Sequence, residues 1–220
     1  MSNEKSIITI DGPSGAGKGT VAKIVADKLG YSYLDTGAMY RILALKFKRS
    51  NCDIDNENEI RKLLDSTKIE LSKQGELLLD SAKITSEIRT QEISLLSSKL
   101  ATKSQVRHYL VNLQRKIGKD GKIVVEGRDM GTYVFPNAKH KFYLDASLNE
   151  RARRRYEQFN QNNTDFQTVL NELKIRDKQD MTREQSPLHP AMNAVIIDST
   201  NLTISEVVGK ILLNVGGTVQ

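Results

Sequence analysis

The sequence predicts an α/β fold: a parallel β-sheet flanked by helices on both faces. Short β-branched segments alternate with segments of helical periodicity along most of the chain, an order typical of parallel sheets. A glycine-rich motif, Gly12-Pro13-Ser14-Gly15-Ala16-Gly17-Lys18, also fits G-x-x-x-x-G-K between the first such strand and the first helix. The 220 residues suit one domain, or one domain with a small inserted subdomain.

The N-terminal part of the chain shows the alternation clearly. A strand over Ser6–Ile10 ends at Asp11 and Gly12. A helix follows over Thr20–Leu29, because its apolar residues recur on one face, and Gly30 is the expected residue after its end. We expect the next strand at Tyr31–Leu34 and the next helix at Ala38–Lys48.

A predicted hairpin then interrupts the alternation. Its strands are Ile69–Leu71 and Leu77–Leu79, on either side of a turn that contains Gly75. Helical patterns follow over about 90–100 and 104–117. We therefore expect one domain over 1–220, with a core of about 1–50 and 101–220 and an inserted subdomain at about 51–100.

The C-terminal part returns to strands that alternate with helices. Strands are expected at Lys122–Val125, Lys141–Leu144 and Ala194–Ile197. Helices are expected near 148–159, 165–180 and Ile204–Leu213, with the polar segment Asn160–Thr164 between the first two.

Composition excludes several classes of protein. The single cysteine, Cys52, cannot form an intramolecular disulfide or a cysteine-rich zinc site. The apolar runs are far shorter than the roughly 20 residues that cross a bilayer, and no apolar stretch precedes the first strand as in a secretory signal. We therefore expect a cytoplasmic protein that does not act at a membrane.

The net charge of +6 is unevenly distributed. Residues 1–50 carry 8 basic and 4 acidic side chains, residues 101–155 carry 13 and 5, and residues 51–100 carry 7 and 10. This distribution suggests an anionic ligand held between the two basic segments. A solvated basic face is the alternative explanation.

The glycine-rich motif has the chemistry of a phosphate cradle. Its glycines let backbone N–H groups turn toward phosphate oxygens, the helix N-terminus adds donors, and Lys18 adds a cation. Gly19 stands where the general motif has Ser or Thr, and Thr20 comes one place later. Magnesium is therefore expected to be held by phosphate and water rather than directly by the protein. The alternative is a glycine-rich turn that binds no nucleotide.

Three further segments are candidates for an acceptor site. Thr36 and Arg41 follow a strand end and offer a hydroxyl and a bidentate fork; alternatively, Thr36 caps the helix and Arg41 is a surface residue. Glu126–Thr132 (EGRDMGT) also follows a strand end, or is an ordinary salt-bridged loop. Arg176, Asp180 and Arg183 are spaced for one helix face, or form a surface ion-pair array.

A cluster of arginines lies near the start of the predicted 148–159 helix. Four of the five residues 151–155 are arginine, so they cannot all face one ligand. Arg151 shares a side with Arg154 or Arg155. They suit a phosphate-bearing ligand, and the alternative is an arm that binds a polyanion.

Together these motifs resemble bacterial-type cytidylate kinase. GPSGAGKGT, LDTGAMYR, EIRTQE, EGRDMGT and an R-D-x-x-D-x-x-R run that ends at Arg183 occur in order over nearly the whole chain. The resemblance implies the P-loop nucleoside monophosphate kinase fold, with 51–100 as the acceptor-binding subdomain and a lid at about 151–165. It implies transfer of the ATP γ-phosphoryl group to cytidine or deoxycytidine monophosphate, in pyrimidine nucleotide metabolism.

The resemblance also implies a role for each matching residue. Gly12 to Thr20 would bind ATP; Thr36, Arg41, Arg128 and Arg183 would hold the acceptor's phosphate; Ser98, Arg107 and Asp129 would read cytosine; Arg176 and Asp180 would contact the sugar, with Tyr40 nearby. Thr36 and Glu126 replace the serine and aspartate that the family often has. Cytosine presents an amino donor beside two acceptors, which suits Asp129 together with Arg107 and Ser98.

The expected reaction needs no strong general base, because the nucleophile is already an anionic phosphate oxygen. Lys18, Arg128, Arg183 and a lid arginine, for which we choose Arg154, would neutralise the transition state together with Mg²⁺. We expect a monomer that binds ATP and the monophosphate but no nucleic acid polymer.

Two rival functions are considered. One is the same fold acting on uridine monophosphate, which the trio Ser98, Arg107 and Asp129 argues against. The other is a nucleic-acid-stimulated ATPase, against which the chain lacks a basic stretch interleaved with base-stacking aromatics.

Overall fold

The computed structural model describes residues 6–72, 75–84, 86–159 and 165–216, with the side chains of 158 and 159 excepted. The chain divides into two compact units, one made of 1–34 with 120–220 and the other of 35–119. The second unit extends beyond the expected 51–100 on both sides. It does so because the helices that flank this range pack within the unit, as described below.

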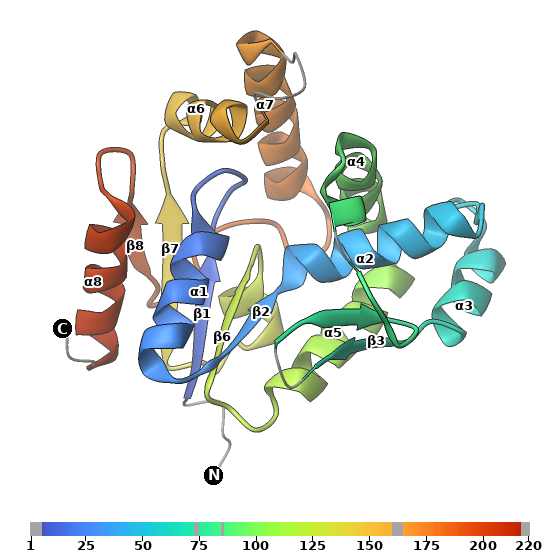
Figure 1. Cartoon of the computed structure of the whole chain (residues 1–220), viewed down its shortest axis with the longest axis horizontal. Coiled ribbons are helices and arrows are strands. Elements are labelled where there is room, and N and C mark those ends of the chain that lie inside the picture. Colours follow the sequence, from blue (N-terminus) through green and yellow to red (C-terminus); the bar gives the residue numbers. More distant parts are fainter. Residues whose placement is uncertain (1–5, 73–74, 85, 160–164, 217–220) are drawn as a thin grey trace. The chain divides into compact units, whose positions relative to one another are not determined.

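The first unit contains a five-stranded sheet (Figure 1). Its strands are β1 (Ile7–Asp11), β2 (Ser32–Asp35), β6 (Ile123–Gly127), β7 (His140–Asp145) and β8 (Val195–Asp198), in the order β2-β6-β1-β7-β8. β1 pairs in parallel with β6 and β7, and β7 with β8. The predicted parallel sheet is confirmed. The carboxyl ends of β1, β6, β7 and β8 therefore lie along one edge, where α/β proteins bind ligands.

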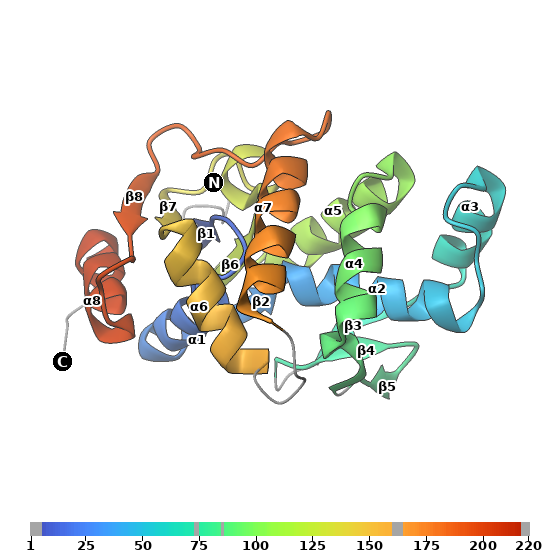
Figure 2. The same cartoon turned by 90° about the horizontal axis from the view of Figure 1, so that it is seen from above.

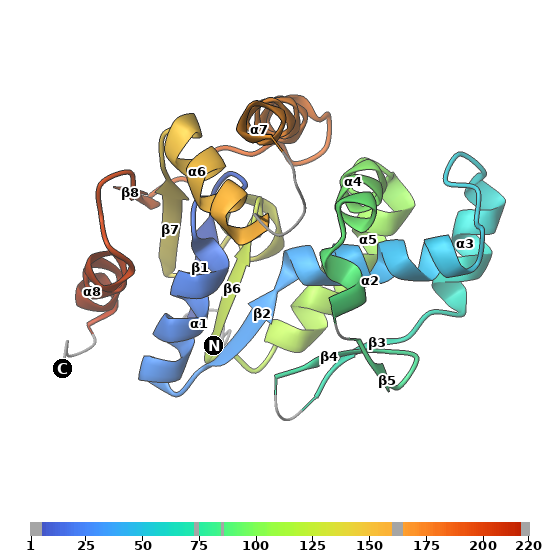
Figure 3. The same cartoon turned by 45° about the horizontal axis from the view of Figure 1, so that its top comes forward.

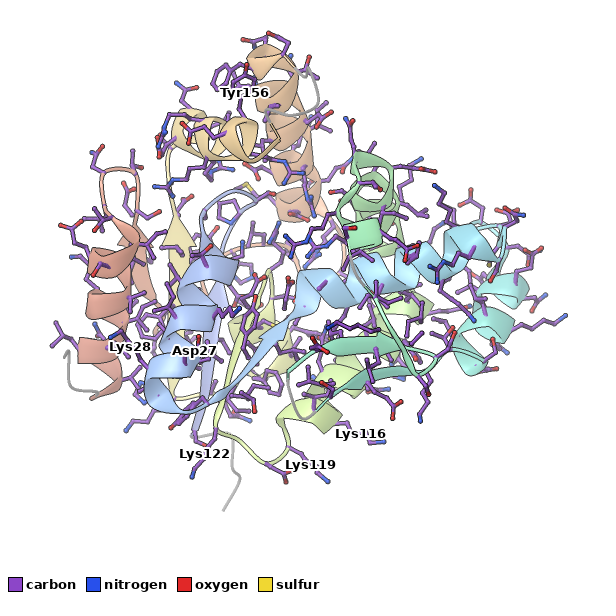
Figure 4. All side chains as sticks on the ribbon, in the orientation of Figure 1. Asp27, Lys28, Lys116, Lys119, Lys122 and Tyr156 are labelled. Atoms are coloured by element: carbon purple, nitrogen blue, oxygen red, sulfur yellow. The ribbon has the colours of Figure 1, made fainter. Side chains whose placement is uncertain are left out.

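Helices flank this sheet, and two of them share its core. α1 (Lys18–Leu29) packs on α8 (Ile204–Val215), and both contribute to one apolar cluster with the strands. Ile8, Phe142 and Ile211 lie in that cluster with almost no exposed surface. The continuous burial of β1 and β6 explains why both strands are apolar through most of their length. Lys28 lies in the last turn of α1 (Figure 4), where a cation stabilises the helix C-terminus.

The two remaining helices of the first unit form a second, smaller layer. α6 (Leu148–Phe159) and α7 (Phe166–Thr182) lie side by side (Figures 1 and 2). They bury Ala152 against Val169 and Leu173. Tyr156, labelled in Figure 4, meets Phe166 edge to face at a centroid distance of 5.8 Å.

The second unit combines helices with a small antiparallel sheet. Its elements are α2 (Thr36–Arg49), α3 (Glu57–Asp65), β3 (Ile69–Leu71), β4 (Leu77–Leu79), β5 (Ala82–Lys83), the 3₁₀ turn η2 (Ser86–Arg89), α4 (Gln91–Leu100) and α5 (Ser104–Gly118). The predicted hairpin is confirmed, with Ile69 opposite Leu79, and β5 extends it to three strands (Figure 3). α2 packs on α4 and α5, so the flanking helices belong to this unit.

Caps set most helix boundaries. The Asp35 carboxylate accepts a hydrogen bond from Ala38 N and caps α2, so Thr36 is the first helical residue and not the cap. α1 begins at Lys18, two residues before the expected start, because Gly17 before it adopts a left-handed conformation with φ 89°. Gly30 ends α1 as predicted. Among the described residues, no helix is both long and apolar enough to span a membrane.

Candidate active site

The glycine-rich loop lies between β1 and α1, as its motif requires. Gly12 has φ 149°, and a Cβ there would stand 2.0 Å from the carbonyl oxygen of Leu144, at the end of β7. Only glycine therefore allows the end of β1 to pass so close to β7. The loop then runs into the N-terminus of α1, where backbone N–H groups without helical partners can face an anion.

Lys18 is the cation of this loop, and its side chain is buried. Its Nζ donates to the carbonyl of Pro13 at 2.7 Å, and the residue is 5% exposed. Burial, and next to it the charge of Arg128, lower the pKa of Lys18 to about 7. A bound polyphosphate would favour the protonated form and so restore the charge.

Gly19 gives the loop no hydroxyl, and a carboxylate lies close to it. A Cβ at Gly19 would stand 3.7 Å from Glu126 Oε1 and 3.4 Å from Tyr33 Oη. Glu126 is buried in β6, and its negative charge raises the pKa of Lys18 against the larger effects above. Thr20 is exposed. The side-chain oxygens near this part of the cradle therefore come from β2 and β6 rather than from the motif.

The segment after β6 forms a partly buried ion pair with α7 and a buried one with the residue that follows α7. Arg128 Nε donates to Asp180 Oδ2 at 2.7 Å, with side chains 18% and 15% exposed. Arg183 Nη2 lies 3.7 Å from Asp129 Oδ2, and both side chains are 7% exposed. Burial opposes the charge of Asp180, but Arg128 and Arg176 hold its pKa below the usual value. The loop after β6 is thus joined by ion pairs to α7 and to the residue that follows it, and these pairs are partly or fully buried rather than on an open surface.

Arg183 differs from its predicted place on the helix. α7 ends at Thr182, and Arg183 is its C-cap residue with extended backbone, φ −62° and ψ 142°. Its Nε donates to Ser186 O at 2.7 Å. Arg176 and Asp180 do lie on α7, as expected, one turn apart. The break in the helix directs the chain away after Thr182, which sequence spacing could not reveal.

The arginines of the run 151–155 differ in burial and in their partners. Arg151 is 6% exposed; its Nη1 donates to Ser14 O at 3.1 Å and to Asp177 Oδ2 at 2.6 Å, and its Nε donates to Ala146 O at 2.9 Å. It therefore ties the cradle loop to α7, a link that sequence analysis missed. Arg153 is exposed and pairs with Glu150 and Glu157 on its own helix.

Arg154 is partly exposed and lies next to the cradle. A Cβ at Gly17 would stand 3.9 Å from its Nη1. Its guanidinium also donates to the hydroxyl and the carbonyl of Ser199, just after β8. Of the arginines in this run whose contacts are given above, Arg154 is the one near the cradle whose side chain still reaches solvent, at 23% exposure. The polar segment Asn160–Thr164 lies outside the described residues.

The other predicted residues lie in the second unit. Thr36 is buried at the first position of α2, and Arg41 Nη2 donates to Asp35 Oδ2 at 3.1 Å. Tyr40 lies on the same helix, Ser98 on α4 and Arg107 on α5. Ser98 Oγ donates to Ser94 O at 3.1 Å, and the buried Ser97 beside it donates to the same carbonyl at 2.8 Å.

The buried Arg107 is an uncommon feature of a helix. It is 3% exposed, and arginine is rarely buried so fully unless a specific partner or ligand uses its guanidinium. Its helix packs against α2, which carries Thr36 and Arg41. The second unit thus holds its own set of hydroxyl and guanidinium groups on three packed helices.

In the first unit, strand ends bring the site together. The cradle follows β1, Arg128 and Asp129 follow β6, the arginine run follows β7 and Ser199 follows β8. Arg128, Glu126, Asp11 and Asp180 all lie close enough to Lys18 to shift its pKa. Among the described residues no group of three or more His, Cys, Asp and Glu side chains is arranged to hold a metal ion. The arrangement suits a phosphate-rich ligand held by cations and backbone N–H groups.

Comparison with known proteins identifies the relatives of this chain. Residues 8–216 match the family model described as cytidylate kinase. The chain is 48% identical over 207 residues to a cytidylate kinase of Thermosipho melanesiensis, covering 93% of this chain and 94% of that protein. It is 45% identical over 211 residues to cytidylate kinase 1 of Haemophilus influenzae, covering 94% and 91%. Among solved structures, an uncharacterized protein from Eubacterium ventriosum shares the fold, with a TM-score of 0.55, 14% identity and coverage of 96% and 98%.

Proposed function

The chain belongs to the cytidylate kinase family, and on that premise we propose that it transfers the γ-phosphoryl group of ATP to cytidine monophosphate or deoxycytidine monophosphate. The observation that carries the proposal is the first unit's sheet edge. There a phosphate cradle with a buried lysine lies beside two arginine–carboxylate pairs, one partly buried and one buried. Such a site supplies backbone donors for one phosphate chain and guanidinium forks for a second phosphate.

We assign the ATP phosphates to residues 12–20 and to Arg154. The cradle's N–H groups bind the phosphate oxygens, and Lys18 neutralises charge on the transferred group. Arg154 lies next to Gly17 and is partly exposed, so a modest movement of its side chain brings it to a triphosphate. Arg151 is not assigned this role, because its side chain is buried between the cradle loop and Asp177, whereas the bonded guanidinium of Arg154 is partly exposed.

Each unit offers residues that we propose for the acceptor, and the two sets are taken separately. In the first unit, Arg128 and Arg183 bind the acceptor's phosphate, Asp129 accepts from the cytosine amino group, and Arg176 and Asp180 contact the sugar. The second unit contributes Thr36 and Arg41 for phosphate, and Ser98 and Arg107 for cytosine, with Tyr40 beside them. Support comes from burial: Arg107 and Asp129 are 3% and 5% exposed, and buried polar groups discriminate strongly between bases.

The chemical step needs positioning and charge neutralisation rather than a base. The attacking oxygen of the monophosphate is already anionic, so it bonds to the γ-phosphorus as the bridge to the β-phosphate of ATP breaks, leaving ADP. Lys18, Arg128, Arg183 and Arg154 offset the charge that spreads over the transferred group. Exclusion of water from the site would favour transfer of the phosphoryl group to the monophosphate over hydrolysis of ATP.

Magnesium is the cofactor that we propose, bound together with ATP. The residues present fit an ion held mainly by phosphate and water, because Gly19 has no hydroxyl and the Glu126 carboxylate nearby can accept from a metal-bound water. When bound, Mg²⁺ neutralises charge on the β- and γ-phosphates. We also propose that the protein works as a monomer in the cytoplasm, where its two nucleotide substrates are dissolved.

An acceptor panel tests the proposed function. ADP and diphosphate formation is measured by a coupled assay with ATP and each common nucleoside monophosphate, with a control that lacks any acceptor. The highest kcat/KM is expected for the two cytidine nucleotides. A higher kcat/KM for uridine monophosphate would instead show that the protein acts on a different acceptor from the one proposed. ATP hydrolysis that needs no monophosphate and rises with RNA would point to a nucleic-acid-stimulated ATPase.

A further inference from the structure

Asp11, the last residue of β1, binds the acceptor-side loop rather than the phosphate cradle that follows it. Its Oδ1 accepts a hydrogen bond from Met130 N at 2.9 Å, and its Oδ2 accepts one from Gly131 N at 2.8 Å. The residue is 2% exposed. Both oxygens of one buried carboxylate are therefore committed to two successive backbone N–H groups that lie about 120 residues further along the chain.

These two N–H groups open a short helical turn whose own first residue does not cap it. Met130–Val134 forms a single π-helical turn, and Asp129 is its N-cap residue without a side-chain hydrogen bond to the turn. An aspartate in that position ordinarily accepts from the N–H groups just after it. Such a cap accepts from the second or third N–H group of the turn, and Asp11, from another strand, occupies the second, Gly131 N. The Asp129 carboxylate is thus turned to other partners, with one oxygen 3.7 Å from Arg183 Nη2.

The packing around this contact leaves the turn little freedom. In the parallel ladder Asp11 lies opposite Gly127, so the loop after β6 starts next to it. A Cβ at Gly131 would stand 2.9 Å from Thr9 Oγ1, 3.2 Å from Ala191 Cβ and 3.4 Å from Asp11 Oδ2. Glycine at 131 therefore lets the turn lie directly against β1, where the carboxylate reaches its N–H groups.

We propose that Asp11 is a positioning residue for base recognition: by capping the 130–134 turn in place of Asp129, it leaves the Asp129 carboxylate to read the acceptor's base. This inference rests on the proposed function, in which Asp129 accepts from the cytosine amino group. It assigns the aspartate directly before the phosphate cradle to the acceptor side of the reaction. Loss of the cap would let Asp129 turn back and bind its own N–H groups, as N-cap aspartates do.

The test is the ratio of kcat/KM for cytidine monophosphate to that for uridine monophosphate. In Asp11→Asn one oxygen becomes an NH₂ group that faces a backbone N–H and cannot accept from it. We expect this ratio to fall by about tenfold or more, the effect of losing one charge-assisted hydrogen bond; any effect on ATP through Lys18 is common to both acceptors and leaves the ratio unchanged. A loss of folded protein alone lowers both kcat/KM values equally and leaves the ratio unchanged.

A double-mutant cycle separates this role from a general disturbance. If Asp11 acts through Asp129, Asp11→Asn should lower the ratio in the wild type and have no further effect in the Asp129→Asn background. Asp80→Asn is the matched control: this residue lies in the turn between β4 and β5, and its carboxylate accepts from Lys68 N at 2.9 Å and pairs with Lys46. That variant should keep the wild-type ratio.

Three results would decide against the inference. The ratio could stay at the wild-type value in Asp11→Asn, it could fall as far in the Asp129→Asn background as in the wild type, or it could fall as far in Asp80→Asn. If Asp11→Asn does not fold, Gly131→Ala perturbs the same contact from the loop side and must lower the ratio. A wild-type protein that does not phosphorylate cytidine monophosphate would contradict the proposed function itself, before any variant is compared.

Discussion

Arg151 and Arg153 lie on the same helix, two residues apart, and the structure predicts opposite consequences of replacing them. The change is arginine to methionine at each position, which removes the charge but keeps much of the apolar stem. Arg151 and its partner Asp177 have side chains that are 7% and 11% exposed. Arg153 is exposed and has two partners, Glu150 and Glu157, on its own helix. Ion-pair geometry alone would rank the two positions alike, but burial ranks them far apart.

The stability that Arg151→Met is expected to lose comes from buried groups that would no longer have a partner. Arg151→Met would strand the buried Asp177 carboxylate and remove the donors to Ser14 O and Ala146 O. Removing one partner of a buried pair costs about 3–5 kcal/mol. For a chain of this size that lowers the melting temperature by roughly 10 °C. Arg153→Met should change the melting temperature little, because exposed pairs contribute little to stability.

Thermal unfolding followed by circular dichroism measures both variants under the same conditions. A third protein, with Arg151→Met and Asp177→Asn combined, should regain part of the lost stability, because the stranded charge is then gone. Equal shifts for Arg151→Met and Arg153→Met would refute the reasoning. So would a double variant that is less stable than Arg151→Met by the full cost of Asp177→Asn alone.

Further predictions concern Lys18 and Asp129. Lys18→Met should abolish phosphoryl transfer while the circular dichroism spectrum stays native, and near-normal turnover would contradict the role of Lys18. In the protein without nucleotide the pKa of Lys18 is about 7, so most Lys18 side chains are neutral at pH 8. ATP binding at pH 8 should therefore take up protons, which is measured by calorimetry in two buffers of different ionisation enthalpy. Lys18→Arg, which stays charged, should bind without that uptake; the same uptake in both proteins would assign it to another group. Asp129→Asn should weaken discrimination against uridine monophosphate, and an unchanged ratio of kcat/KM values would exclude Asp129 from base recognition.

Local patterns were enough to predict most of the first unit. Apolar runs predicted β1, β6, β7 and β8 to within about two residues at each end. For β1 and β6 the signal is strongest, because both strands are buried along their whole length and must be apolar through most of it. The phosphate cradle could be placed as well, since its geometry depends on glycines and a helix start that are adjacent in sequence. The hairpin could be placed too, because two short apolar runs flank a turn that contains Gly75, but its register comes from the structure alone.

Helix α3 was not predicted, although two local features of the sequence indicate it. α3 begins after Asn56, whose side chain accepts from Asn58 N and Glu59 N. Asn56 and Glu59 have the spacing of a capping box, and Ile60 and Leu64 share one face. These residues could have predicted the helix, although it has only nine residues.

Other features depended on contacts that sequence spacing does not contain. The turn at Met130–Val134 is too short to show any periodicity. It is capped by Asp11, which lies far away in sequence, at the end of β1. Arg151 looks like its neighbours in sequence, and only the approach of Asp177 and Ser14 distinguishes it. The departure of Arg183 from the helix is likewise set by its bond to Ser186 O after the helix end.

The most direct test of the central claim follows the phosphoryl group itself. ATP labelled in its γ-phosphate is incubated with the protein, Mg²⁺ and cytidine monophosphate, and the products are separated. We predict that the label appears in cytidine diphosphate, with little inorganic phosphate, and that omission of cytidine monophosphate leaves the label in ATP. Label released as inorganic phosphate at the same rate with and without cytidine monophosphate would contradict the account.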